Sequence, residues 1–290
     1  MRWIGITTLG LSLVVAATDR ACAHGALHQQ LIDVSALLAE HPDDFDLLLR
    51  RGELQRLHGS WSESRADFEK AQKLRPDELE PVFRLGRLEL DAENPTAAAH
   101  WLEATLEKKP HHIEAALLMA RAQVKLGRPS AAVESFSTAI HWSRQPRPEW
   151  FLERSKAILA AGKDPKDREA LKRATASLDE GLELIGPVPT LQLAAIELDL
   201  LAGFVDVALK RLDTVREASE RKETWWFRRG LILEEAGRPK EALQAFDSTL
   251  AALGALPDRL QRTLAMVELR KDLAQHRSRL RPDSESPSNP

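Results

Sequence analysis

The chain has 290 residues, of which 43% are hydrophobic and 29% charged, a composition that suits a soluble helical protein and is too apolar for a wholly disordered one. Lysine and arginine total 41 against 44 aspartates and glutamates, so the formal net charge is −3. This balance supplies no general attraction for nucleic acid or for acidic membranes. We therefore expect no nucleic-acid partner, and any electrostatic binding has to be local.

The N-terminus has the pattern of an export signal. Arg2 precedes an apolar run from Ile4 to Ala17, and the small-residue pattern Ala21-Cys22-Ala23 follows a short polar stretch. We expect residues 1–23 to be removed as a signal peptide by cleavage before His24, which predicts a periplasmic or secreted protein. A retained membrane anchor is the alternative, but the run is shorter than the roughly 20 apolar residues that a bilayer requires. The only cysteine would leave with the signal, so we expect no disulfide, thiolate metal site or cysteine nucleophile in the mature chain.

Residues 24–44 are expected to form an N-terminal capping helix. An apolar stripe runs from Gly25 to Glu40, and the sequence His41-Pro42-Asp43-Asp44 ends the helix. Such a cap has a physical purpose, because the first member of a stacked array would otherwise leave its apolar face in water.

From Phe45 the sequence repeats with a constant period. Gly52 and Gly86 lie 34 positions apart, and Pro76 and Pro110 are separated by the same interval. Each unit has apolar residues three and four positions apart, then a break at Gly, Asn or Pro, then a second such stretch, which predicts a helical hairpin. Six units fit, at residues 45–78, 79–112, 113–147, 148–188, 189–222 and 223–256.

Small and large side chains alternate between the two helices of each unit. One slot of the first helix carries a small residue except at Ile196; the set is Gly52, Gly86, Ala120, Ser155, Ile196 and Gly230. The second helix is expected to turn inward the alanines Ala66, Ala71, Ala98, Ala132, Ala139, Ala208 and Ala242, with the bulky Phe68, Leu102, Phe136, Leu178, Leu212 and Phe246. A small residue opposite a large one lets the layers interdigitate without voids.

These residues resemble the tetratricopeptide repeat: a small residue late in the first helix, Ala and Phe at fixed intervals in the second, and a closing proline. The resemblance covers roughly residues 45–256. It implies an all-α protein, a right-handed α-solenoid of about six helix-turn-helix repeats with capping helices, similar to exported bacterial members of the family. The chain departs from the pattern at Lys163 to Arg168, which look like an insertion. It also lacks the usual aromatic late in the first helix, where it has Gln55, Glu89, Gln123, Ile158, Asp199 and Leu233.

The C-terminal part is expected to cap the array. Residues 257–280 predict one long amphipathic helix with arginines on its outer side. Residues 281–290 carry no apolar pattern, so we expect a disordered tail.

The resemblance implies protein binding on the concave face, which is lined by the first helix of each pair. We expect a partner-binding groove with an apolar stripe of Leu49, Phe83, Leu117, Leu152, Leu193 and Phe227 beside a charged stripe of Glu53, Arg87, Arg121, Lys156 and Glu197. Arg87, Arg121 and Lys156 would form a basic centre suited to a peptide with apolar anchors and a carboxylate. The alternative is that the charges are merely solvated and the apolar stripe packs between repeats.

A metal site at the mature N-terminus is a second hypothesis. After cleavage His24 would carry the free amine, with His28 one turn later. An amine and two imidazoles suit Cu(II) in a tetragonal site. A polar chain end without any ligand is the plainer interpretation, and we expect no other cofactor.

Nothing in the sequence indicates catalysis. It contains no nucleophile elbow, zinc-protease motif, phosphate-binding glycine loop or dinucleotide fingerprint. The tryptophans, including Trp61, Trp142 and Trp226, are expected to pack in the core rather than to serve as stacking platforms. We therefore predict a non-enzymatic scaffold or adaptor that binds a partner peptide. An exported metal-handling protein is the alternative, and an enzyme comes third.

Overall fold

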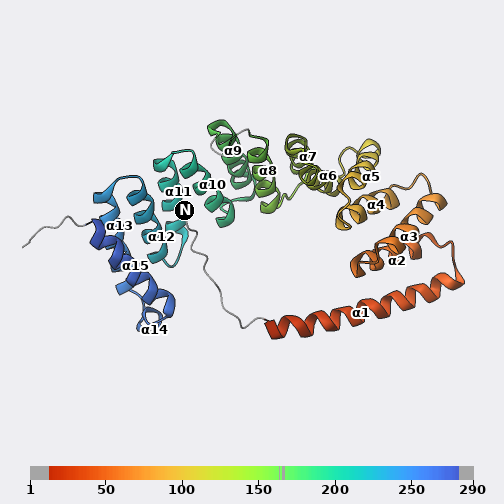
Figure 1. Ribbon diagram of the computed structural model, residues 1–290, viewed down its shortest axis with the longest axis horizontal. Coiled ribbons are helices and arrows are strands. Elements are labelled where there is room, and N and C mark those ends of the chain that lie inside the picture. Colours follow the sequence, from red (N-terminus) through yellow and green to blue (C-terminus); the bar gives the residue numbers. More distant parts are fainter. Residues whose placement is uncertain (1–12, 163, 165–166, 281–290) are drawn as a thin grey trace, which may run out of the picture. The chain divides into compact units, whose positions relative to one another are not determined.

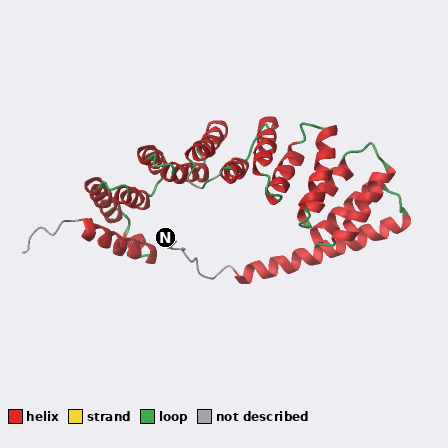
Figure 2. Ribbon diagram, turned by 45° about the horizontal axis from the view of Figure 1, so that its top comes forward, coloured by secondary structure: helices red, strands yellow, loops and turns green. Residues whose placement is uncertain are grey.

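The computed structural model describes the backbone of residues 13–162, 164 and 167–280, and within these ranges the side chains from residue 25 onward. Across this part of the chain the protein has fifteen helices and no strand (Figures 1 and 2). The predicted all-α solenoid of helical hairpins is confirmed. Contacts divide the chain into two compact units, Met1–Ser143 and Arg144–Pro290, called unit 1 and unit 2 below.

Unit 1 consists of one long helix followed by three hairpins. The helices are α1 (Leu13–Glu40), α2 (Phe45–His58), α3 (Trp61–Leu74), α4 (Glu80–Asp91), α5 (Pro95–Lys108), α6 (Ile113–Lys125) and α7 (Pro129–Trp142). Each even-numbered helix from α2 on pairs with the helix that follows it, and α1 packs on α2. Helix α1 ends at Glu40 as expected. It begins at Leu13, so it runs through the expected cleavage point.

Unit 2 consists of three hairpins and a C-terminal pair of helices. The helices are α8 (Pro148–Ala161), α9 (Arg168–Ile185), α10 (Pro189–Leu201), α11 (Val205–Ala218), α12 (Glu223–Glu235), α13 (Pro239–Gly254), α14 (Asp258–Gln261) and α15 (Leu264–Leu280). Five of the six expected repeat starts are the first residue of a helix, and the sixth, Leu79, immediately precedes α4. Residues 1–12 of the expected export signal (1–23) and the whole expected tail (281–290) lie outside the described residues.

Five of the six hairpin turns share one backbone conformation, and the exception is the turn after α8, where Gly162 has φ −68°. Gly59, Gly127, Gly203 and Gly237 have φ between 68° and 85°, and the equivalent residue of the second repeat is Glu93, with φ 61°. Glycine adopts this left-handed conformation without a steric penalty, which explains the break between the two helices. Glu93 accepts the conformation while its carboxylate binds Lys125 Nζ at 2.5 Å.

The small slot brings the two helices of a hairpin into close contact. A Cβ atom added at Gly52 would lie 2.5 Å from the Phe68 ring, and one added at Gly86 would lie 2.7 Å from Leu102 Cγ. Ala66 was expected to face inward, but it is exposed. Ser64 occupies the inward position, which Ala98 holds in the next repeat. Its buried hydroxyl donates to the Gly52 carbonyl at 2.7 Å.

His112 caps helix α6 and provides a pH-dependent contribution to stability. Its Nδ1 accepts a hydrogen bond from the Ala115 backbone N–H at 3.2 Å, so this nitrogen must be unprotonated. Burial, together with the charge of Lys109, lowers the pKa of His112. The unfolded chain therefore takes up the proton first as the pH falls, and stability is lost between the unfolded and the folded pKa.

The variant His112→Asn tests this contribution. Asparagine retains a capping acceptor that does not titrate near neutrality. We expect the variant to lose less stability than the wild type when thermal unfolding is compared at about pH 7.5 and about pH 5.5. An equal loss in both proteins would show that folding leaves the pKa of His112 unchanged.

The C-terminal cap differs from the prediction of one helix with outward arginines. The chain forms two helices, α14 and α15, because the Thr263 hydroxyl donates to the Leu260 carbonyl at 2.7 Å and closes the first of them. Two of the arginines face the array instead of solvent. Arg277 binds Asp247 of α13 at 2.6 Å, and Arg270 donates to the Leu253 carbonyl of α13 at 3.4 Å and to Gln261 Oε1 of α14 at 2.6 Å.

Candidate protein-binding face

In unit 1 the first helices of the repeats are neighbours, since α2 contacts α4 and α4 contacts α6. The predicted apolar stripe lies here on Leu49, Phe83 and Leu117, which are only 8%, 5% and 6% exposed. These side chains pack in the core between repeats. They therefore offer a partner little apolar surface in this unit.

The charged stripe of unit 1 forms a ladder of ion pairs between repeats. Arg84 of α4 lies 3.6 Å from Glu53 of α2, and Arg87 of α4 lies 3.4 Å from Glu114 of α6. Burial by itself opposes ionisation of Glu53, but hydrogen bonds from Arg56 and the nearby charges of Arg87 and Arg84 outweigh it and lower the pKa of this carboxyl. Arg121 of α6 is half-buried and also has an interaction partner.

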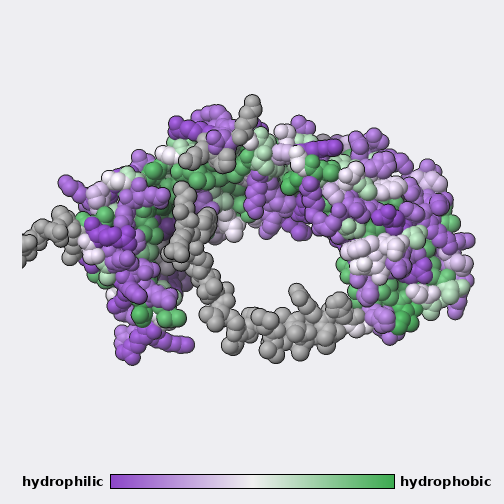
Figure 3. All heavy atoms as spheres, in the orientation of Figure 1, coloured by the Kyte–Doolittle hydropathy of each residue, from purple (hydrophilic) through white to green (hydrophobic). Residues whose placement is uncertain are grey.

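In unit 2 the same stripes are more accessible. Leu152 of α8, Leu193 of α10 and Phe227 of α12 are half-buried, and Lys156 and Glu197 are exposed. Arg228 approaches Glu197 at 3.5 Å, whereas Lys156 forms no ion pair with any described residue. Figure 3 shows hydrophobic residues at the surface of unit 2 in the region of α9, α10 and α11. Unit 2 thus presents half-exposed apolar groups beside an available ammonium.

The predicted basic centre is divided between the units. Arg87 and Arg121 belong to unit 1 and Lys156 belongs to unit 2. Neither unit therefore assembles the three cations by itself, and in unit 1 Arg87 is already paired.

Sequence reasoning missed what replaces the absent aromatic residues. Buried Glu89 binds Arg65 at 2.6 Å, and buried Asp199 binds Arg211 at 2.7 Å. Arg211 also donates two hydrogen bonds to Asp179, at 2.6 and 2.8 Å. In these two repeats the slot is thus filled by carboxylate–guanidinium pairs, which are strong when both groups are fixed and partly buried.

A pocket of about 310 Å³ lies in unit 2 between α11, α12 and α13. Its walls are Asp213, Arg216, Trp226, Arg229, Leu233, Glu241, Gln244, Ala245 and Ser248. On α12 these residues occupy a different face from Phe227 and Leu231. The pocket is therefore separate from the predicted groove, and no pattern in the sequence had indicated it.

The tryptophans do not all pack in the core as predicted. Trp142 is 45% exposed and Trp61 is 37% exposed. The ring of His111 lies 3.6 Å from that of Trp142, centroid to centroid. Trp226 is half-buried, and the Arg216 guanidinium lies over its ring at 3.8 Å from the centroid. For Trp142 the cause is position, because it is the last residue of α7, where no following turn covers it.

The metal hypothesis gains no support from the described residues. His28 is exposed on α1, and the side chain of His24 lies outside the described part. Among the described side chains no three His, Cys, Asp or Glu residues are grouped as metal ligands. None of the described helices has the length and apolarity of a membrane span.

The comparisons define the class of protein. Profiles of the tetratricopeptide repeat match residues 33–78, 89–154 and 193–257, more than half of the chain. Together with the stacked hairpins, these matches make the protein a helical-repeat scaffold for protein interactions. The chain belongs to the tetratricopeptide-repeat family.

Solved structures agree on the fold. A tetratricopeptide repeat protein from Parabacteroides merdae has a TM-score of 0.50 at 15% identity, over 90% of this chain and 97% of that one. A chain in the structure of Naa15/Naa10 bound to HypK-THB has a TM-score of 0.50 at 15% identity, over 90% of this chain and 38% of that one. No curated protein matches in sequence.

Proposed function

We propose that the protein binds a peptide segment of a partner along the face made by the first helices, with the main contacts on α8, α10 and α12. The observation that carries this proposal is the contrast between the units. The apolar stripe is buried in unit 1, but Leu152, Leu193 and Phe227 remain half-exposed in unit 2, beside Lys156, which has no ion pair among the described residues. Half-exposed apolar side chains next to a cation suit a segment with apolar anchors and a carboxylate.

The site is non-catalytic in this proposal. The stripes on α8, α10 and α12 combine leucine, phenylalanine, lysine and glutamate on helices, an arrangement that holds a chain but activates no nucleophile. Binding by such a face gains affinity from a few buried anchors, and Phe227 is the largest of them.

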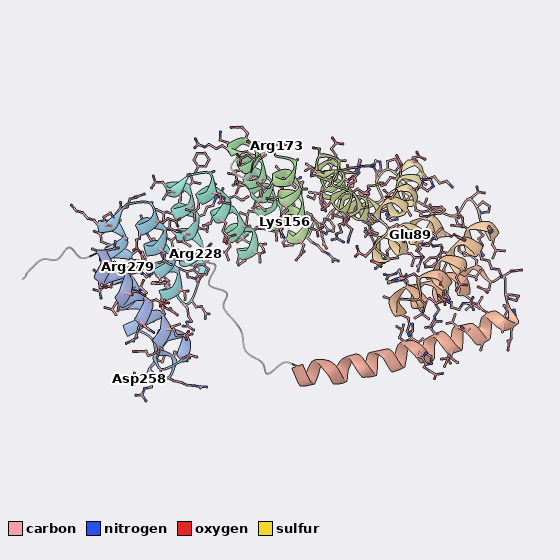
Figure 4. All side chains as sticks on the ribbon, in the orientation of Figure 1. Glu89, Lys156, Arg173, Arg228, Asp258 and Arg279 are labelled. Atoms are coloured by element: carbon pink, nitrogen blue, oxygen red, sulfur yellow. The ribbon has the colours of Figure 1, made fainter. Side chains whose placement is uncertain are left out.

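Charge reversal at Lys156 tests the proposal, and Arg173→Glu is the matched control. Both cations are exposed and free of ion pairs with described residues, and Figure 4 shows Lys156 on α8 and Arg173 on α9 at opposite edges of one hairpin. We expect Lys156→Glu to weaken capture of specific partners by about tenfold, with Arg173→Glu close to wild type. Thermal unfolding shows first that both variants are folded.

Phe227→Ala supplies a second test that does not depend on charge. We expect it to reduce binding of the same partners, since it removes an anchor of the face. If partners remain bound to both Lys156→Glu and Phe227→Ala, binding uses another surface. If Arg173→Glu weakens binding as much as Lys156→Glu does, the effect belongs to net charge and the proposed face is wrong.

We further propose that the protein acts after export, in the periplasm or outside the cell. The support is the N-terminal pattern, in which a cation precedes an apolar run and a small-residue cleavage site. N-terminal sequencing of the protein recovered from the envelope or medium is expected to begin at His24. A chain recovered with an intact Met1 from the cell interior would contradict this part of the proposal.

A further inference from the structure

The pocket between α11, α12 and α13 has a counterpart one repeat earlier that is filled. A shift of one repeat length takes Asp179 to Asp213, Asp199 to Leu233 and Arg211 to Ala245. In the earlier repeat the Arg211 side chain spans the space and binds both aspartates, at 2.6 to 2.8 Å. In the later repeat Asp213, Leu233 and Ala245 line the pocket. The pocket therefore lies where the preceding repeat has a guanidinium and a second carboxylate that this repeat lacks.

The remaining carboxylate of the pocket is shared by two other arginines. Arg216 donates to Asp213 Oδ1 at 2.6 Å, and Arg229 donates to Asp213 Oδ2 at 2.9 Å. One repeat earlier the corresponding positions are Leu182 and Ala195, which carry no charge. The group of two carboxylates and one guanidinium has thus become a group of two guanidiniums and one carboxylate.

The hydrogen bonds already made in the pocket indicate which kind of ligand it could bind. Both oxygens of Asp213 are occupied, and both oxygens of Glu241 accept from Arg238, each at 2.7 Å. A guanidinium has five N–H donors. Arg229 makes one hydrogen bond to the described protein groups, and Arg216 makes one, while Arg216 Nη2 also lies 3.6 Å from Glu217 Oε1. The two arginines therefore keep more unused N–H donors than Asp213 and Glu241 keep unused acceptor sites.

The rest of the wall is apolar or flat. The Trp226 ring, held under the Arg216 guanidinium, forms one side, and Leu233 and Ala245 form another. Gln244 and Ser248 add neutral polar groups at the wall. A volume of about 310 Å³ is at the small end of ligand pockets, so the bound group has to be small.

We propose that this pocket binds a carboxylate carried on a small apolar or aromatic body, with Arg229 and Arg216 as the donors. The carboxylate takes the role that Asp199 has one repeat earlier, and its apolar part contacts Trp226 and Leu233. The same chemistry is present in a free aryl carboxylate and in the C-terminal residue of a peptide. This site lies on a face of α12 other than the one proposed for a partner segment, so the two proposals can fail independently.

Phenylacetate and N-acetylphenylalanine, each with its amide as control, are the probes for titration calorimetry on the full chain. We expect both carboxylates to bind at least about tenfold more tightly than their amides, because an amide offers no charge to the guanidiniums. Tighter binding of N-acetylphenylalanine would indicate that the pocket binds the C-terminal residue of a peptide. Tighter binding of phenylacetate would indicate that it binds a free aryl carboxylate. Equal binding of acid and amide, or no saturation by either acid below about 1 mM, overturns the proposal.

Two neighbouring arginines of α12 provide the matched variants. Arg229→Gln removes a donor from the pocket, whereas Arg228→Gln alters only the face that pairs with Glu197. We expect phenylacetate affinity to fall about tenfold in Arg229→Gln and to stay unchanged in Arg228→Gln. Equal losses in both variants contradict the assignment.

A filled pocket is the complementary variant, and it covers the case in which Arg229→Gln unfolds. The double change Leu233→Asp with Ala245→Arg reproduces Asp199 and Arg211 of the preceding repeat and should occupy the space internally. We expect this protein to remain folded by circular dichroism and to lose phenylacetate binding. Retained binding in the folded double variant would show that the ligand sits elsewhere.

Discussion

Replacing Gly86 with leucine is expected to destabilise the protein by about 3 kcal/mol. A Cβ atom at this position would lie 2.7 Å from Leu102 Cγ and 3.3 Å from the Leu102 backbone nitrogen. A side chain could rotate away, but the backbone of α5 cannot move without opening the hairpin. Thermal unfolding followed by circular dichroism measures the effect.

Gly254→Leu is the control for that substitution. Gly254 is also a helical glycine, at the end of α13, but no atom lies within 4 Å of its added Cβ. We expect its unfolding temperature to stay close to that of the wild type. If Gly86→Leu were as stable as Gly254→Leu, the close contact between α4 and α5 would not exist in solution.

Replacing Arg211 with methionine is expected to cost about 3 kcal/mol or more at neutral pH. Asp199 is 4% exposed, and the variant would leave this buried carboxylate without its charged partner. Methionine preserves much of the volume of the arginine stem, so the loss reports mainly on the ion pair. The free energy of unfolding in denaturant measures it.

The destabilisation by Arg211→Met is expected to shrink as the pH falls. Burial raises the pKa of Asp199 even though Arg211 opposes the rise, and removal of Arg211 will raise it further. A carboxyl whose folded pKa exceeds its unfolded pKa costs stability when ionised, and this cost disappears as the pH falls through the folded value. We expect a smaller difference from wild type at about pH 5 than at about pH 7.

Asp199→Leu distinguishes the cost of leaving a buried carboxylate without a partner from the cost of losing the whole ion pair. This change removes the buried charge itself and leaves Arg211 bound to Asp179. We expect it to cost much less than Arg211→Met, because replacing a buried charge by an apolar residue avoids the desolvation penalty. If Asp199→Leu destabilised the protein as much as Arg211→Met, the ion pair would contribute more to stability than the burial of its charges costs.

The periodic features of the fold could be predicted from the sequence. The recurrence of Gly52 and Gly86, each followed at the same interval by Phe68 or Leu102, predicted helices that touch at one small residue, and the structure places these residues in contact. Such contacts are local in sequence, so residue type and register are sufficient to predict them. Ala66 shows the limit of such predictions. It lies two residues after Ser64, the inward position, and two residues along a helix place a side chain on another side.

The candidate sites were harder to predict because they depend on accessibility and on pairing. Leu49 and Leu193 occupy the same repeat position, yet Leu49 is buried and Leu193 is half-exposed. The difference comes from the neighbouring helices. Arg87 and Lys156 likewise share a position but differ in whether a glutamate of the next repeat is within reach. The pocket depends on Leu233 and Ala245, whose significance appears only when each repeat is compared with the one before it.

The contact between Arg277 and Asp247 closes the C-terminal end of the repeat array. Asp213 of α11 is bound by Arg229 of the next first helix, and Asp247, at the equivalent position of the following repeat, is bound by Arg277 of α15. Met266 and Leu273 of the same helix pack in the cluster that contains Phe246. Helix α15 thus takes the place that a seventh hairpin, or the exposed end of a second molecule, would need. A chain truncated after Gly254 is therefore expected to expose the apolar face of the last repeat, and such a face favours association between copies.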